Sequence, residues 1–179
     1  MNIQQHERIA RIKQISGYLY VGMTWARYLL WALCPLIAGL VLFGSKGTLH
    51  LGDMQMTVAD LSLVQRVLVL ALIAVILFFI LKVIHHFRAL MRYFSVGDIF
   101  NKKAIDHARK ALHHSLGFFV VHMVSSIAMS AYLLSDMQNF SISLDSDYLF
   151  GFLIFGLMFV LLWALEIGCD LNEESELTI

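Results

Sequence analysis

Four long apolar stretches constrain this chain more than any other feature, because each is about as long as a helix that crosses a lipid bilayer. A helix rises ~1.5 Å per residue and the hydrocarbon core is ~30 Å thick, so about 20 residues cross it. The stretches cover residues 18–43, 63–84, 116–134 and 148–165. Strands that cross a membrane alternate polar and apolar residues, and these stretches do not. The sequence therefore predicts an all-α membrane protein, a four-helix transmembrane bundle in one domain over residues 1–179.

The composition excludes both a soluble domain and an intrinsically disordered chain. Hydrophobic residues make up 59% of the chain and charged residues 15%, whereas soluble proteins contain about 45–50% and 25%. A soluble fold of this composition would expose large apolar patches, and 12% aromatic residues are not typical of disorder. The two cysteines, Cys34 and Cys169, give neither a disulfide framework nor the spacing of a zinc site.

Lysine and arginine residues are distributed unevenly between the ends of the four stretches. The N-terminal tail contains three and residues 82–110 contain seven, whereas the other connections contain only Lys46 and, at the membrane edge, Arg66. The positive-inside rule places such basic segments in the cytoplasm. We therefore predict a multi-pass membrane protein whose termini, central loop (residues 85–115) and acidic tail (residues 166–179) are all cytoplasmic.

The two outer connections contain short alternating segments. Apolar residues between positions 49 and 58 lie on both sides of Gly52-Asp53, which is the pattern of two strands around a tight turn. In the second connection, Phe140, Ile142 and Leu144 alternate with polar residues. We predict that the two loops pair as a small extracytoplasmic β-sheet over the bundle, and irregular loops with accidental alternation are the alternative.

The central loop contains one helix break. We expect the second helix to continue from His85 to Phe94 and to end at Ser95-Val96-Gly97. Asn101 has the side chain of a good N-cap, so the third helix is expected to begin there, well before the membrane.

The sequence contains no catalytic motif. It has no nucleophile elbow, phosphate-binding loop, zinc-protease motif or dinucleotide fingerprint, so we expect no enzymatic activity and no cofactor. Two histidine pairs, His85/His86 and His113/His114, are expected at one cytoplasmic level. They leave open an alternative function as a haem or metal redox protein, although such interfacial histidines are more often amphipathic anchors or phosphate contacts. A small-molecule transporter is a third interpretation, disfavoured because the spans contain few polar residues.

Two ionisable residues lie near the inner ends of their spans, Arg27 in the first and Glu166 beside the fourth. A charge at the bilayer centre costs about 2.5–3.5 kcal/mol, and less at the edge, unless it is paired or reaches the headgroups. We predict an ion pair between Arg27 and Glu166, with independent contact to the headgroups as the alternative.

The strongest charge contrast lies on the predicted cytoplasmic side. Five acidic residues follow Leu165 without a basic one, whereas the central loop is strongly basic. The two segments either neutralise each other or form a docking surface on which a cytoplasmic partner competes with the tail. In the second interpretation, Ile99 and Phe100 anchor the turn against Leu177 and Ile179. The predicted docking face consists of Gly97, Ile99, Phe100, Lys102, Lys103, Arg109, Lys110, Glu173, Glu174, Leu177 and Ile179.

Two motifs carry a resemblance to a known family. The stretch Phe94-Ser95-Val96-Gly97-Asp98-Ile99-Phe100, followed by Asn101 and a basic helix, resembles a signature of the bacterial membrane family called domain of unknown function 2975. The ending Leu171-Asn172-Glu173-Glu174-Ser175-Glu176-Leu177-Thr178-Ile179 resembles the closing pattern of that family, an acidic run before Leu-Thr-Val/Ile.

The resemblance implies a location in the bacterial cytoplasmic (inner) membrane. Members of this family are often encoded beside a small helix-turn-helix transcription regulator, which implies such a regulator as a cytoplasmic partner and no direct contact with nucleic acid. Together these observations favour a non-enzymatic regulatory or scaffolding protein in contact with the lipid bilayer. The sequence leaves its oligomeric state open.

Overall fold

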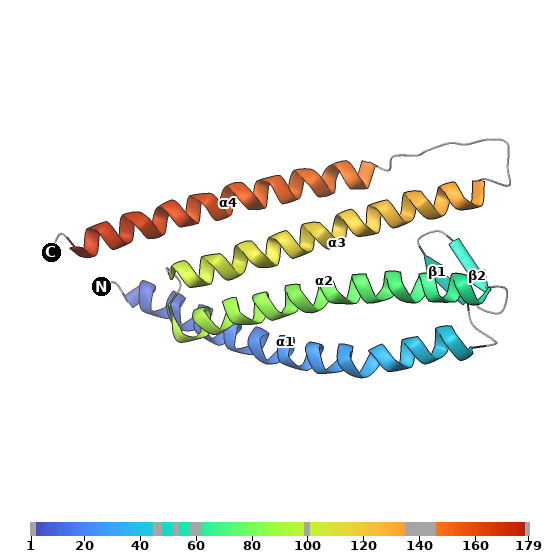
Figure 1. The fold of residues 1–179 in the computed structure, drawn as a ribbon. Helices are drawn as coiled ribbons and strands as arrows, with labels where there is room; N and C mark the ends of the chain where they lie inside the picture. Colours follow the sequence, from blue (N-terminus) through green and yellow to red (C-terminus); the bar gives the residue numbers. More distant parts are fainter. Residues whose placement is uncertain are drawn as a thin grey trace.

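The computed structural model describes residues 3–44, 48–51, 54–57, 62–98, 101–134 and 146–177. Four helices dominate it: α1 (Ile3–Phe43), α2 (Leu63–Val96), α3 (Lys102–Leu134) and α4 (Ser146–Leu177). They run alternately up and down and pack in sequence order, α1 on α2, α2 on α3 and α3 on α4 (Figure 1). The prediction of an all-α fold with four long apolar helices is confirmed.

Each helix contains a segment that is long and apolar enough to cross a membrane. These segments are Ala10–Phe43, Leu63–Val96, Lys102–Ala128 and Tyr148–Leu171. Their large apolar side chains point outward, and Phe43 and Trp25 are 85% and 72% exposed. Exposure of apolar surface to water costs roughly 25 cal/mol per Å², a penalty that lipid tails remove. The helices therefore identify a multi-pass integral membrane protein in contact with the bilayer.

Buried apolar side chains gather where α2 meets α3. Leu90, Met91 and Ala104 form a core cluster, against which Tyr20 of α1 and Phe94 pack. In water the hydrophobic effect drives such burial, whereas helices inside a bilayer gain little from hiding apolar surface from each other. The core thus lies in the part of the molecule that extends beyond the apolar stretches.

Side chains and one glycine define the limits of α2 and the start of α3. Ser62 and Gln65 form a capping box at the start of α2, in which the Gln65 N–H donates to Ser62 Oγ at 3.3 Å. Gly97, with φ of +96°, ends α2, and its N–H donates to the carbonyl of Phe94 at 3.1 Å. Asn101 Oδ1 accepts a hydrogen bond of 2.8 Å from the Lys103 N–H. The predicted break at Gly97 and the predicted cap at Asn101 are confirmed.

Two short strands follow α1. β1 (Thr48–Leu51) and β2 (Met54–Thr57) pair antiparallel, with Thr48 opposite Thr57 and Leu51 opposite Met54. The segment expected to join them, residues 139–144, lies outside the described residues. A sheet built from both outer loops therefore stays a prediction.

Candidate functional site

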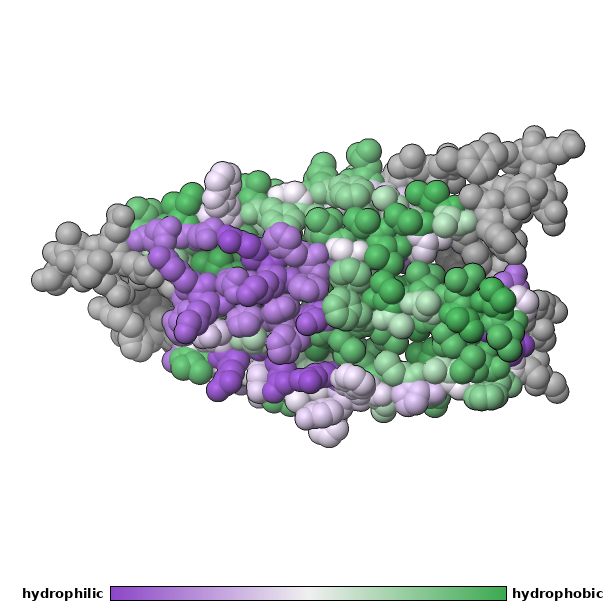
Figure 2. All heavy atoms as spheres, in the orientation of Figure 1, coloured by the Kyte–Doolittle hydropathy of each residue, from purple (hydrophilic) through white to green (hydrophobic). Residues whose placement is uncertain are grey.

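Hydrophilic residues gather at one end of the molecule, where α1 begins, α2 meets α3 and α4 ends (Figure 2). We call this region the polar end, and it comprises the described residues outside the four apolar stretches at this end, namely 10–17, 85–98, 101–115 and 166–171. The basic and acidic residues of the predicted docking face belong to this end, so the candidate site is built here.

Two ion pairs join α3 to α4 at the polar end. Lys102 Nζ lies 3.0 Å from Asp170 Oδ1, and the Arg109 guanidinium donates to the Glu166 carboxylate. All four side chains remain between 36% and 54% exposed. Exposed pairs of this kind contribute only about 0–1 kcal/mol each. They therefore select which faces of the two helices meet, and they are weak enough to be exchanged.

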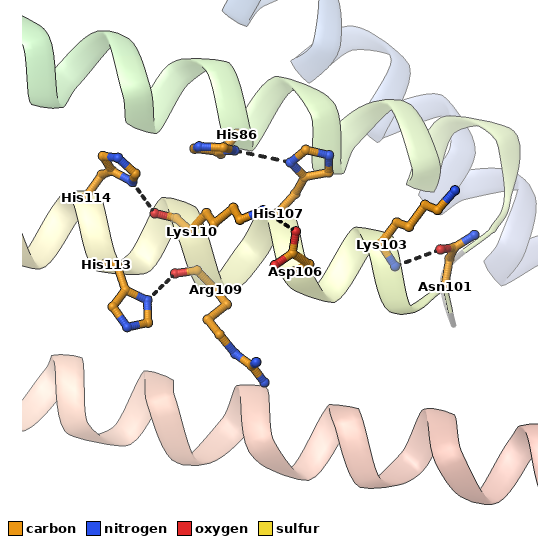
Figure 3. A network of polar contacts seen from close by, with 9 residues as sticks. All are labelled: His86, Asn101, Lys103, Asp106, His107, Arg109, Lys110, His113 and His114. Carbon is orange, nitrogen blue, oxygen red and sulfur yellow. Dashed lines mark hydrogen bonds and ion pairs between the residues drawn. The ribbon is translucent and has the colours of Figure 1, made fainter.

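Glu166 pairs with Arg109 of α3 in place of its predicted partner, Arg27 of α1. The physical reason is the order of the helices, because α4 packs on α3 whereas α1 packs on α2. Arg109 points directly toward α4 (Figure 3). The hydropathy pattern indicates the depth of Arg27 and Glu166 along their helices, but depth alone does not determine which helices are neighbours.

The other basic residues of α3 have different surroundings. Lys110 Nζ lies 2.6 Å from Asp106 Oδ2 one turn earlier in the same helix. This hydrogen bond from Lys110 keeps the pKa of Asp106, which lies beyond the apolar stretches, below its ordinary value. Lys103 points away from α4 (Figure 3). The predicted basic surface is thus divided between residues that hold α4 and one that does not.

Lys13 of α1 lies against the end of α2. A Cβ atom on Gly97 would lie 2.2 Å from Lys13 Cε, which shows how closely the lysine approaches. A cation near the C-terminus of a helix interacts favourably with the helix dipole. Gly97 is therefore required twice, for its positive φ and for the close approach of Lys13.

Part of the predicted docking face lies outside the described residues. This applies to Ile99, Phe100 and Ile179, and to the side chains of Glu173, Glu174 and Leu177, although α4 itself continues to Leu177. The contact between the turn and the tail therefore stays a prediction.

Histidines gather where α2 meets α3 (Figure 3). His86 of α2 lies between His107 and His114 of α3, with ring centroids 5.5 and 5.3 Å away. The Nδ1 atoms of His86 and His107 are 3.2 Å apart, and His85 meets the His86 ring edge-on at 5.2 Å. His107 is not among the predicted histidines. Its position one heptad before His114 is the signal that both lie on the same face of α3.

His113 does not join this group. Its ring packs against Phe159 of α4 with centroids 5.1 Å apart, and its Nδ1 lies 2.8 Å from the carbonyl oxygen of Arg109. The two predicted pairs, His85/His86 and His113/His114, are therefore at one end of the molecule but do not face one another as a set of four.

The histidine group has the geometry of a packed contact. Across the described part of the chain, no three His, Cys, Asp or Glu side chains are arranged to hold a metal ion. His107 and His114 are about 10 Å apart along the axis of α3, so they flank His86 and do not converge on one point. Burial, followed by the charges of neighbouring groups such as His85, lowers the pKa of His86 to about 4. His86, which lies beyond the apolar stretch of α2, is therefore neutral at pH 7.

A cavity of about 440 Å³ opens beside the end of α2. Arg92 and Asp98 are its charged lining groups, and the Asp98 carboxylate accepts a hydrogen bond of 2.6 Å from Asn101. The remaining lining residues are Ala89, Tyr93, Val96 and His107. The polar end thus offers a recess with charged and apolar walls next to the Gly97 turn.

No family model, no curated protein and no solved structure matches the chain.

Proposed function

We propose that this chain is a non-enzymatic regulatory or scaffolding protein of the bacterial cytoplasmic membrane, and that it acts on a cytoplasmic partner through its polar end. The uneven distribution of lysine and arginine supports this orientation, because basic segments are retained on the cytoplasmic side. In this orientation the β1–β2 hairpin is extracytoplasmic, and the second outer loop adds to its sheet.

The observation that carries the proposal is the double ion pair between α3 and α4. Lys102 and Arg109 are held by Asp170 and Glu166, in pairs that stay about half exposed. Because each pair contributes only about 0–1 kcal/mol, an acidic surface on a partner can replace the carboxylates of α4. The partner then gains the same basic face of α3, with Lys103 as an additional cation.

The resemblance to domain of unknown function 2975 suggests the identity of the partner. A small helix-turn-helix regulator would present an acidic surface to α3, while its basic DNA-binding surface would be excluded by the like charge. The membrane protein would then retain the regulator at the membrane without touching nucleic acid itself.

Crosslinking in native membranes, followed by mass spectrometry of the captured proteins, tests this proposal. The double variant Glu166→Gln and Asp170→Asn removes the competing carboxylates and should increase capture of the partner several-fold. Lys102→Gln with Arg109→Gln should abolish capture. Glu7→Gln, which removes a carboxylate from α1, is the matched control and should leave capture unchanged. Identical captured proteins in all variants would contradict the proposal.

A further inference from the structure

The basic residues of the polar end and its border fall into two groups that differ in their surroundings. On α3, Lys102, Arg109 and Lys110 each pair with a carboxylate. By contrast, the sequence contains no Asp or Glu between residues 8 and 52 or between residues 61 and 97, which covers nearly all of α1 and α2. The positive charge of the α1–α2 half is therefore not neutralised by its own helices.

Two contacts set the antiparallel register of α1 and α2. Arg88 Nη2 donates to the Tyr20 hydroxyl at 3.0 Å, and Arg66 Nη1 donates to the Leu42 carbonyl at 2.8 Å. The two pairs are separated by the same number of residues on both helices, so the register is constant between them. Arg27, seven residues after Tyr20, therefore lies level with the position seven residues before Arg88, next to Lys82.

The electrostatic coupling of His85 agrees with this register. Burial is the main reason for the lowered pKa of His85, and the charges of Arg27 and Lys82 lower the pKa further. The two cations on neighbouring helices thus act on one imidazole just beyond the apolar stretch of α2. Within the described residues, neither Arg27 nor Lys82 has a carboxylate partner.

The depth of these cations corresponds to a headgroup layer. The segment from Leu63 to Lys82 is about 29 Å long, which is the thickness of the hydrocarbon core. Lys82 therefore lies where the core ends, and its Nζ is 5.5 Å from the ring centroid of Phe78. Trp25 and Tyr28 are strongly exposed on either side of Arg27, as aromatic residues at a membrane interface are.

We propose that Arg27 and Lys82 form a binding site for the phosphate group of an anionic phospholipid, at the level where the α1–α2 pair leaves the hydrocarbon core. The guanidinium of Arg27 donates hydrogen bonds to the phosphate oxygens and Lys82 supplies a second charge. The contact between Tyr20 and Arg88 holds the two helices in the register that brings both cations to one level. The site goes beyond the docking role of α3 and does not depend on it.

Native mass spectrometry of the purified full-length protein tests the site directly. The protein is titrated with phosphatidylglycerol, with phosphatidylcholine as the zwitterionic comparison. Each basic residue near an anionic surface contributes about fivefold in affinity, so Arg27→Gln with Lys82→Gln should weaken phosphatidylglycerol binding roughly 25-fold. Lys102→Gln with Lys103→Gln removes two charges far from the core and should change binding less than about twofold, because screening acts within ~8 Å.

Further arms of the experiment separate a defined lipid site from misfolding, from nonspecific charge attraction and from a site for free phosphate. The exchange variant, Arg27→Lys with Lys82→Arg, keeps both charges and should retain most of the binding, which excludes misfolding as the cause of a loss. Inorganic phosphate at millimolar concentration should not displace the lipid. Equal losses in both Gln double variants, equal binding of phosphatidylcholine, or displacement by free phosphate would each overturn the proposal.

Discussion

Replacing Gly97 by alanine should lower the free energy of unfolding by about 1–2 kcal/mol, because the residue keeps the left-handed conformation that a Cβ atom disfavours. The φ of +96° is fixed by two hydrogen bonds, since the N–H groups of Gly97 and Asp98 donate to the carbonyls of Phe94 and Tyr93. The added Cβ would also lie 2.2 Å from Lys13 Cε. That side chain is flexible and can move away, so we attribute most of the loss to the backbone.

Titration of the protein from a mild detergent into a denaturing one, followed by circular dichroism, measures this free energy. Gly17→Ala is the matched control, since Gly17 lies within α1 with no atom within 4 Å of an added Cβ. Alanine there should raise stability by roughly 0.5–1 kcal/mol, because it favours the helix. Gly97→Ala in a Lys13→Met background should show the same loss if the backbone is the cause. A Gly97→Ala protein as stable as the Gly17→Ala protein would refute the reasoning.

The contacts at the polar end lead to three further predictions. Acidification should destabilise the protein between about pH 6.5 and 4, because the pKa of His86 is lowered to about 4: the unfolded chain takes up the proton first, so stability is complete above this range and declines as the pH falls. Unfolding curves across this range should be flatter for His86→Phe, and an unchanged pH dependence would show that His86 is not responsible. The single variants Arg109→Gln and Glu166→Gln should each change stability by less than about 1 kcal/mol, since the pair is exposed, and a larger loss in the same denaturation assay would mean that the pair is buried in the bilayer. Deletion of residues 171–179 should reduce partner capture or lower the melting temperature, and a protein that is unchanged in both measurements would remove the tail from the docking face.

The positions of the helices could be predicted from the sequence because they depend on local chemistry. The length of each apolar run sets a membrane helix, glycine at position 97 ends α2, and asparagine at position 101 caps α3. Each of these effects acts within one or two helical turns, so a single sequence contains the information that determines it.

The neighbours of each helix could not be predicted in this way. Depth and opposite charge favour a pair between Arg27 and Glu166, but the helices pack in series and Arg109 stands next to Glu166. Adjacent histidine pairs do not reveal His107, because its packed contact with His86 depends on the heptad spacing to His114. Pairings between helices depend on how whole faces fit, which the spacing of charges along one helix does not determine.

The orientation of the polar end is the claim on which the docking surface depends, and reporter fusions measure it most directly. A fluorescent protein that folds only in the cytoplasm, fused after Ile179, should fluoresce, and alkaline phosphatase at the same position should be inactive. The same two reporters fused after Leu51, in the β1–β2 hairpin, should give the opposite results. Active phosphatase after Ile179 would place the polar end outside the cell and contradict the account.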